Sequence, residues 1–125
     1  MRKVLLVLTG VLNLLFGVFH VFLGYQIHSW IALSDHARGI MQACNIGCTL
    51  LVFFLAYVCL VRGKELMSTG LGGAVLGLGT LIYLSRGAEE FVLFEGNLAI
   101  LGSCLAAGLL HLGLMLGVRM PARET

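Results

Sequence analysis

Hydrophobic residues gather into four long segments along the chain, and short polar junctions separate them. The segments lie near 4–24, 40–61, 69–84 and 98–118. A helix needs about 20 residues to cross a hydrocarbon layer roughly 30 Å thick, and the third segment reaches that length when it continues into the charged stretch 85–94. We therefore predict an all-α membrane protein, a bundle of four transmembrane helices in one domain (1–125). The helices are expected near 4–24, 36–61, 69–92 and 97–118.

Composition excludes an ordinary soluble domain. Of the 125 residues, 59% are hydrophobic and 11% are charged, whereas soluble domains carry about 25% charged residues. The net charge of +2 is too small and too dispersed for nucleic-acid binding, which needs a clustered basic face. The chain opens as a signal peptide would, but no small-x-small cleavage site follows the first segment, so we interpret that segment as a helix.

The basic residues mark alternate junctions between the segments. They precede the first segment, join the second to the third, and follow the fourth: Arg2, Lys3, Arg62, Lys64, Arg119 and Arg123. Only Arg38 and Arg86 lie at the other two junctions. Because basic residues flank membrane spans on the cytoplasmic side, we predict a multi-pass protein of the bacterial inner (plasma) membrane with both termini in the cytoplasm.

The first helix carries a stripe of small and polar residues. They recur every three or four positions and so share one face: Gly10, Asn13, Gly17, His20 and Gly24. Small residues let membrane helices approach closely, and polar residues avoid lipid. We therefore expect this stripe to face the interior of the bundle.

Small-residue pairs also occur in the last two helices: Gly73 with Gly77, Gly102 with Ala106, and Gly113 with Gly117. Such pairs serve packing within a bundle and association between copies alike. The predicted partners are therefore the lipid bilayer and either a second copy of the chain or a larger membrane complex.

The stretch 25–39 mixes apolar and polar residues between the first two helices. Tyr25 and Trp30 are expected at the membrane interface, where aromatic residues are enriched. Asp35 is expected to cap the second helix, and a short interfacial helix is expected before it.

The depths of the polar residues predict two contacts between helices. At a rise of about 1.5 Å per residue, His20 and Asn45 both lie roughly 6–8 Å from the outer ends of their helices. Asn13 and His111 lie about 10–13 Å from the inner ends of theirs. We therefore expect His20 to meet Asn45, and Asn13 to form a structural polar pair with His111. The two histidines differ in depth by roughly 13 Å, which excludes one haem bound by both, because axial nitrogens lie about 4 Å apart.

Charged residues at the outer end of the third helix support two interpretations. Arg86 lies three and four residues before Glu89 and Glu90, so these side chains can form a salt bridge along one helix. They can instead lie above His20 and Asn45 and form with them a polar pocket at the outer face. Such a pocket would hold a lipid head group, a quinone or an ion.

All four cysteines lie inside hydrophobic segments: Cys44, Cys48, Cys59 and Cys104. Small polarizable residues there serve packing. A zinc or copper site formed with His20 would need three helices to converge and thiolates in an apolar layer. His28 and His36 lack a recognised ligand spacing. We predict no metal and no cofactor.

Three short motifs give the chain a resemblance to a known group. They are Asn13 with Gly17 and Phe19-His20, Met41 with Asn45, and Arg86 with Glu89. In them, and over most of its length, the chain resembles a loosely defined group of small, uncharacterised four-span bacterial inner-membrane proteins. The resemblance implies a four-helix inner-membrane fold and supplies no reaction, ligand or partner. Glu90 stands where similar proteins would have an uncharged amide.

Three functions are open at this point. The sequence has no nucleophile, nucleotide or metal motif, which favours a non-enzymatic accessory subunit or a small-ligand-binding bundle with the pocket described above. The alternative is a membrane enzyme that acts on a lipid or quinone at the outer leaflet, through His20 and the three charged residues beside it. The third is an ion or proton transporter with a path along His20, Asn13 and His111.

Overall fold

Helices account for nearly all of the chain that the structure, a computed structural model, describes: residues 2–93 and 97–118. They are α1 (Arg2–Ser29), α2 (Asp35–Leu60), α3 (Gly63–Leu66), α4 (Gly70–Leu93) and α5 (Leu98–Leu116). No strand occurs in these two ranges. The four longer helices are each long and apolar enough to cross a membrane. The all-α prediction and the four long apolar helices are therefore confirmed.

The connection between the first two helices differs from the prediction. No separate interfacial helix forms, because α1 continues to Ser29 and its buried side continues to Ile27. The N-cap of α2 is Ser34 rather than Asp35, and its hydroxyl accepts a hydrogen bond from the Ala37 amide at 3.3 Å. Serine is as good a cap as aspartate. Ser34 is therefore the cap because α2 begins at Asp35.

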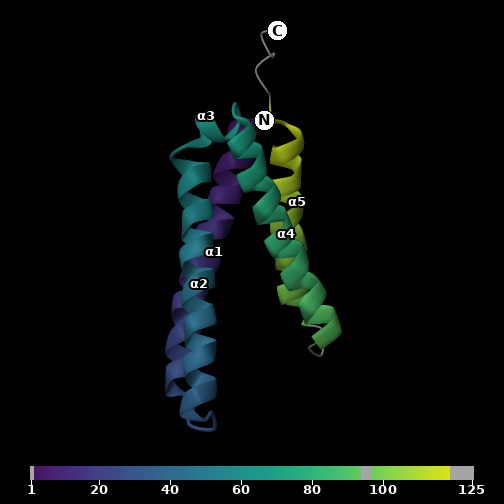
Figure 1. The fold of residues 1–125 in the computed structure, drawn as a ribbon. Helices are drawn as coiled ribbons and strands as arrows, with labels where there is room; N and C mark the ends of the chain where they lie inside the picture. Colours follow the sequence, from purple (N-terminus) through teal and green to yellow (C-terminus); the bar gives the residue numbers. More distant parts are fainter. Residues whose placement is uncertain (1, 94–96, 119–125) are drawn as a thin grey trace.

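The four long helices form two antiparallel hairpins, α1 with α2 and α4 with α5, and α3 lies in the link between them (Figure 1). The hairpins meet beside α3 and diverge toward their other ends. We call the end with α3, the start of α1 and the end of α5 the closed end. The opposite end, with the α1–α2 and α4–α5 connections, is the open end.

Glycines determine how closely each hairpin packs. The three glycines of the α1 stripe lie so close to α2 that an added Cβ would collide with it: Gly10 with Leu60, Gly17 with Phe53, and Gly24 with Asn45. In the second hairpin the same holds for Gly79 against His111 and for Gly108 against Leu84. The glycine-and-polar face of α1 therefore faces its neighbours, as the stripe predicts, and it is buried at Gly10, Asn13 and Gly17.

Other small residues of α5 point away from the bundle. Gly102, Ala106 and Gly113 are all exposed, and an added Cβ at Gly102 or Gly113 would meet nothing within 4 Å. The predicted small-residue pairs of α5 therefore contribute little to packing within the chain.

The core joins the two hairpins in two clusters. The cluster nearer the closed end contains Val58, Cys59, Leu66, Leu76 and Leu114. The second contains Val52, Leu55, Tyr83, Cys104 and Ala107. Both draw residues from both hairpins, so the apolar contact that holds the molecule together lies between the closed end and the middle of the helices.

Candidate functional site

A fully buried polar cluster joins the hairpins beside the core. The side-chain amide of Asn13 (α1) lies 3.3 Å from Nε2 of His111 (α5), and its Oδ1 accepts a hydrogen bond from the Tyr83 (α4) hydroxyl at 2.7 Å. Asn13 is 1% exposed and His111 is 0% exposed. The structure thus brings Asn13 and His111 together and adds Tyr83, a residue that the pattern of polar positions did not predict.

Hydrogen bonds assign the protonation of this cluster. The Ala107 carbonyl accepts from Nδ1 of His111 at 2.8 Å, so Nδ1 carries the proton and Nε2 carries a lone pair. That lone pair accepts one N–H of the Asn13 amide, and the second N–H goes to the Thr9 carbonyl at 2.7 Å. Each polar atom of His111 and Asn13 therefore has a partner, and none remains for a ligand.

A second asparagine–histidine pair lies toward the open end, between α1 and α2. Oδ1 of Asn45 lies 2.9 Å from Nδ1 of His20, and Nδ2 of Asn45 donates to the His20 carbonyl at 2.9 Å. Gln42 donates to the Gly24 carbonyl at 2.6 Å. The close approach at Gly24 lets α2 supply these amides, so the α1 stripe positions the pair.

The ring of His20 is held through one nitrogen. Because Oδ1 of Asn45 can only accept, Nδ1 of His20 carries a proton. In the neutral ring, Nε2 then carries a lone pair. Among the described residues, Nε2 has no hydrogen-bond partner. A histidine oriented through Nδ1 in this way is suited to bind a donor or accept a proton at Nε2.

The charged residues of α4 divide into two roles. Arg86 donates to Glu90 at 2.8 Å, and the other oxygen of Glu90 accepts from the Asn97 amide at 3.2 Å, just before α5 begins. Glu90 is only 4% exposed, so it ties α4 to the start of α5. Glu89 is exposed. Glu90 therefore forms the salt bridge with Arg86, and the adjacent Glu89 is left for the pocket.

A cleft of about 430 Å³ lies between the two hairpins toward the open end. His20 lines it from α1, and Arg86 and Glu89 line it from α4. Its apolar lining includes Phe16, Phe19, Leu23, Leu51, Val52, Ile82 and Ile100. Three of the five predicted pocket residues thus line one cleft. The other two, Asn45 and Glu90, lie behind it and each holds a lining residue in place.

A smaller apolar hollow of about 290 Å³ adjoins the cleft along α1 and α5. The two share Phe16, Phe19 and Ile100. Polar side chains are almost absent from this hollow, where Ser103 is the one polar lining residue among those described. The cleft therefore continues into an apolar groove that leads between the hairpins.

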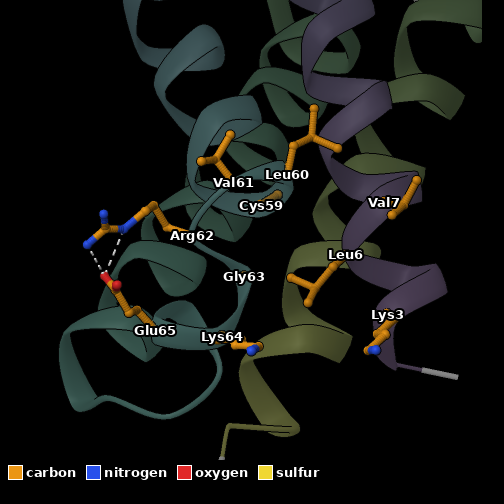
Figure 2. A pocket seen from close by; sticks show the side chains of 10 residues that line it. All are labelled: Lys3, Leu6, Val7, Cys59, Leu60, Val61, Arg62, Gly63, Lys64 and Glu65. Atoms are coloured by element: carbon orange, nitrogen blue, oxygen red, sulfur yellow. Dashed lines mark hydrogen bonds and ion pairs between the residues drawn. The ribbon is translucent and has the colours of Figure 1, made fainter.

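A separate hollow of about 580 Å³ lies at the closed end, between α1 and the α2–α3 junction. Figure 2 shows Lys3 on α1 and Lys64 on α3 on either side of it, and the Arg62–Glu65 ion pair on the side away from α1. Hydrogen bonding to Glu65, and then its charge, raise the pKa of the Arg62 guanidinium. Because Arg62 and Glu65 neutralise each other, Lys3 and Lys64 give the hollow a net positive charge. The hollow could not be predicted from the basic junctions, because it depends on how α1 packs against the α2–α3 junction.

The described residues contain no group of three or more His, Cys, Asp or Glu side chains that could hold a metal ion. Cys48 and Cys104 line the cleft together with His20, but they do not converge with it into a ligand set. Cys44 is exposed and Cys59 is buried in the core.

Comparison of the chain with protein-family models, with curated proteins and with solved structures finds no match.

Proposed function

We propose that the chain is a multi-pass protein of the bacterial inner membrane that binds a small amphiphile in the cleft between its hairpins. In this proposal the closed end faces the cytoplasm. The basic hollow formed there by Lys3 and Lys64 supports that orientation, because basic residues stay on the cytoplasmic side during insertion. The protein then acts as a non-enzymatic accessory subunit or ligand-binding bundle, and its pocket opens toward the outer leaflet.

The observation that carries the proposal is the composition of the cleft. Ligand sites combine apolar walls with a few convergent polar groups, and His20, Arg86 and Glu89 supply such groups on an otherwise largely apolar lining. Ionisable residues within membrane spans are costly and therefore favour a functional interpretation. An amphiphile from the bilayer satisfies both parts of the lining.

Filling the cleft tests the proposal. Leu51 lines it, whereas the adjacent Leu50 is 67% exposed and points away. We expect Leu51→Trp to lower the molar ratio of amphiphile that copurifies with the protein about tenfold, a typical steric effect in an apolar pocket. Leu50→Trp should leave it unchanged. The measurement is mass spectrometry of organic extracts from protein purified in mild detergent.

Thermal unfolding of both tryptophan variants provides the control, since each must retain the wild-type transition. Wild-type protein without a bound amphiphile, or equal retention by Leu50→Trp and Leu51→Trp, would contradict the proposal.

The bond from Asn45 to His20 favours a second candidate, a membrane enzyme acting on the bound lipid or quinone. An orienting partner on Nδ1 and a lone pair on Nε2 are the features of a general base. In that case His20→Gln, whose amide oxygen can still accept a hydrogen bond, would stop conversion of the amphiphile while the protein still retains it. If the wild-type protein converts no bound amphiphile, the enzyme is contradicted and only the binding function remains.

Association with a second copy or with a larger membrane complex is also proposed. The exposed small residues Gly102, Ala106 and Gly113 on α5 support it, because such faces pack closely against another helix. Native mass spectrometry in mild detergent tests it. A monomer without any bound protein would count against it.

A further inference from the structure

The charges around the cleft select against an acidic head group. Glu89 and Glu90 outnumber Arg86, and Arg86 is paired with Glu90 at 2.8 Å. With His20 neutral, these groups carry a net charge of −1. An anionic head placed among them would meet a net negative charge and be repelled. A cationic head would be attracted to Glu89 but would leave Nε2 of His20 without a donor unless it carried an N–H.

The hydrogen-bonding capacity of His20 narrows the choice further. Nδ1 is occupied by Asn45, so in the neutral ring Nε2 acts as an acceptor. A ligand that matches it must offer a donor, and the carboxylate of Glu89 on the α4 side of the cleft is a second acceptor. Two acceptors of this kind suit a head group that carries hydroxyls.

We infer that the ligand of the cleft is an amphiphile without an anionic head, and that its head carries a hydroxyl that donates to Nε2 of His20. The inference rests on the proposed function and specifies its ligand class. The apolar hollow that shares Phe16, Phe19 and Ile100 with the cleft receives the chain of the amphiphile. That chain then leads into the bilayer between α1 and α5.

This chemistry has two sources in a membrane, a quinol and a lipid alcohol such as a diacylglycerol. Both have an uncharged, hydroxyl-bearing head and an apolar chain. Binding to full-length protein in zwitterionic phosphatidylcholine nanodiscs, without oxygen, separates them. The probes are a short-tailed benzoquinol, its di-O-methyl ether, dioctanoylglycerol and dioctanoyl phosphatidic acid.

We expect the benzoquinol or the dioctanoylglycerol to bind about tenfold more tightly than the ether, which keeps the shape of the quinol but lacks the donors. Phosphatidic acid should bind more weakly than the hydroxyl probe that binds best. His20→Phe should abolish the preference for the benzoquinol over its ether, or for dioctanoylglycerol over dioctanoyl phosphatidic acid. His28→Phe should keep it, since His28 is exposed and does not line the cleft.

The outcomes separate the inference from the proposed function. If the ether binds as tightly as the quinol and dioctanoylglycerol binds no more tightly than either, or if phosphatidic acid binds best, the inference is overturned while the binding function stands. If the wild-type protein binds none of the four probes, the binding function itself fails. The comparison of probes on wild-type protein decides the matter even where His20→Phe does not fold.

Discussion

The two asparagine–histidine pairs contain the same types of side chain but differ in how completely these side chains are hydrogen-bonded. His111 and Asn13 lie in the closed, packed part of the molecule, where each polar atom of their side chains is bonded within the protein. His20 and Asn45 lie toward the open end, and His20 keeps one ring nitrogen without a partner among the described residues. Burial with complete bonding indicates a structural role, whereas an oriented group at the edge of a cleft indicates chemistry or binding.

Substituting the two asparagines should separate these roles most strongly. Asn13→Leu leaves the Tyr83 hydroxyl and Nε2 of His111 buried without partners, so we expect a loss of about 2–5 kcal/mol in the free energy of unfolding. Asn45→Leu should cost about 1–2 kcal/mol, because its partner His20 is half-buried. Denaturant unfolding in detergent micelles measures both, and equal losses would remove the distinction between the pairs.

The packing around His111 should be the next most sensitive feature. An added Cβ at Gly79 would collide with the His111 ring, whereas one at Gly113 would meet nothing within 4 Å. We expect Gly79→Ala to destabilise the protein by about 1–3 kcal/mol through overpacking. Gly113→Ala should be neutral or stabilising by up to about 1 kcal/mol from helix propensity. A Gly79→Ala protein as stable as wild type would show that the ring of His111 can move.

Glu89 and Glu90 also differ in how completely they are bonded within the protein, and substituting them should change the free energy of unfolding by smaller amounts. Glu90→Gln weakens the bonds to Arg86 and to the Asn97 amide, so we expect a loss of about 1–2 kcal/mol. Glu89→Gln should change stability by less than about 0.5 kcal/mol, because Glu89 is exposed. Matched unfolding curves give both values. The reverse order would mean that Glu89, not Glu90, holds α4 to α5.

Much of this arrangement could be predicted because membrane helices have a fixed rise. The distance of Asn13, His20, Asn45 and His111 from the ends of their segments determines their depth, and groups at equal depth on neighbouring helices can meet. Tyr83 was missed because depth alone does not distinguish a buried hydroxyl from an interface anchor. Glu90 was expected in the pocket, but its i,i+4 pairing with Arg86 and its contact at the start of α5 place it behind the cleft.

Lateral arrangement could not be predicted in the same way. Glycine spacing shows that a helix face allows close approach, but it does not identify the partner. The glycines of the α1 stripe pack on α2, whereas Gly102 and Gly113 of α5 face outward. The divergence of the hairpins, which creates the cleft, and the short helix α3 depend on tertiary contacts around Leu66, which lies in the core although its flanking sequence is polar.

In the proposed orientation, the charge distribution would make the molecule sensitive to the membrane potential. Among the described residues, Arg2, Lys3, Arg62 and Lys64 against Glu65 leave the closed end at net +3. Arg38 and Arg86 against Asp35, Glu89 and Glu90 leave the open end at −1. An inside-negative potential contributes about 2.3 kcal/mol per 100 mV for each unit charge kept on its favourable side. In the proposed orientation, an inside-negative field would thus favour the basic closed end on the inside and the acidic open end on the outside.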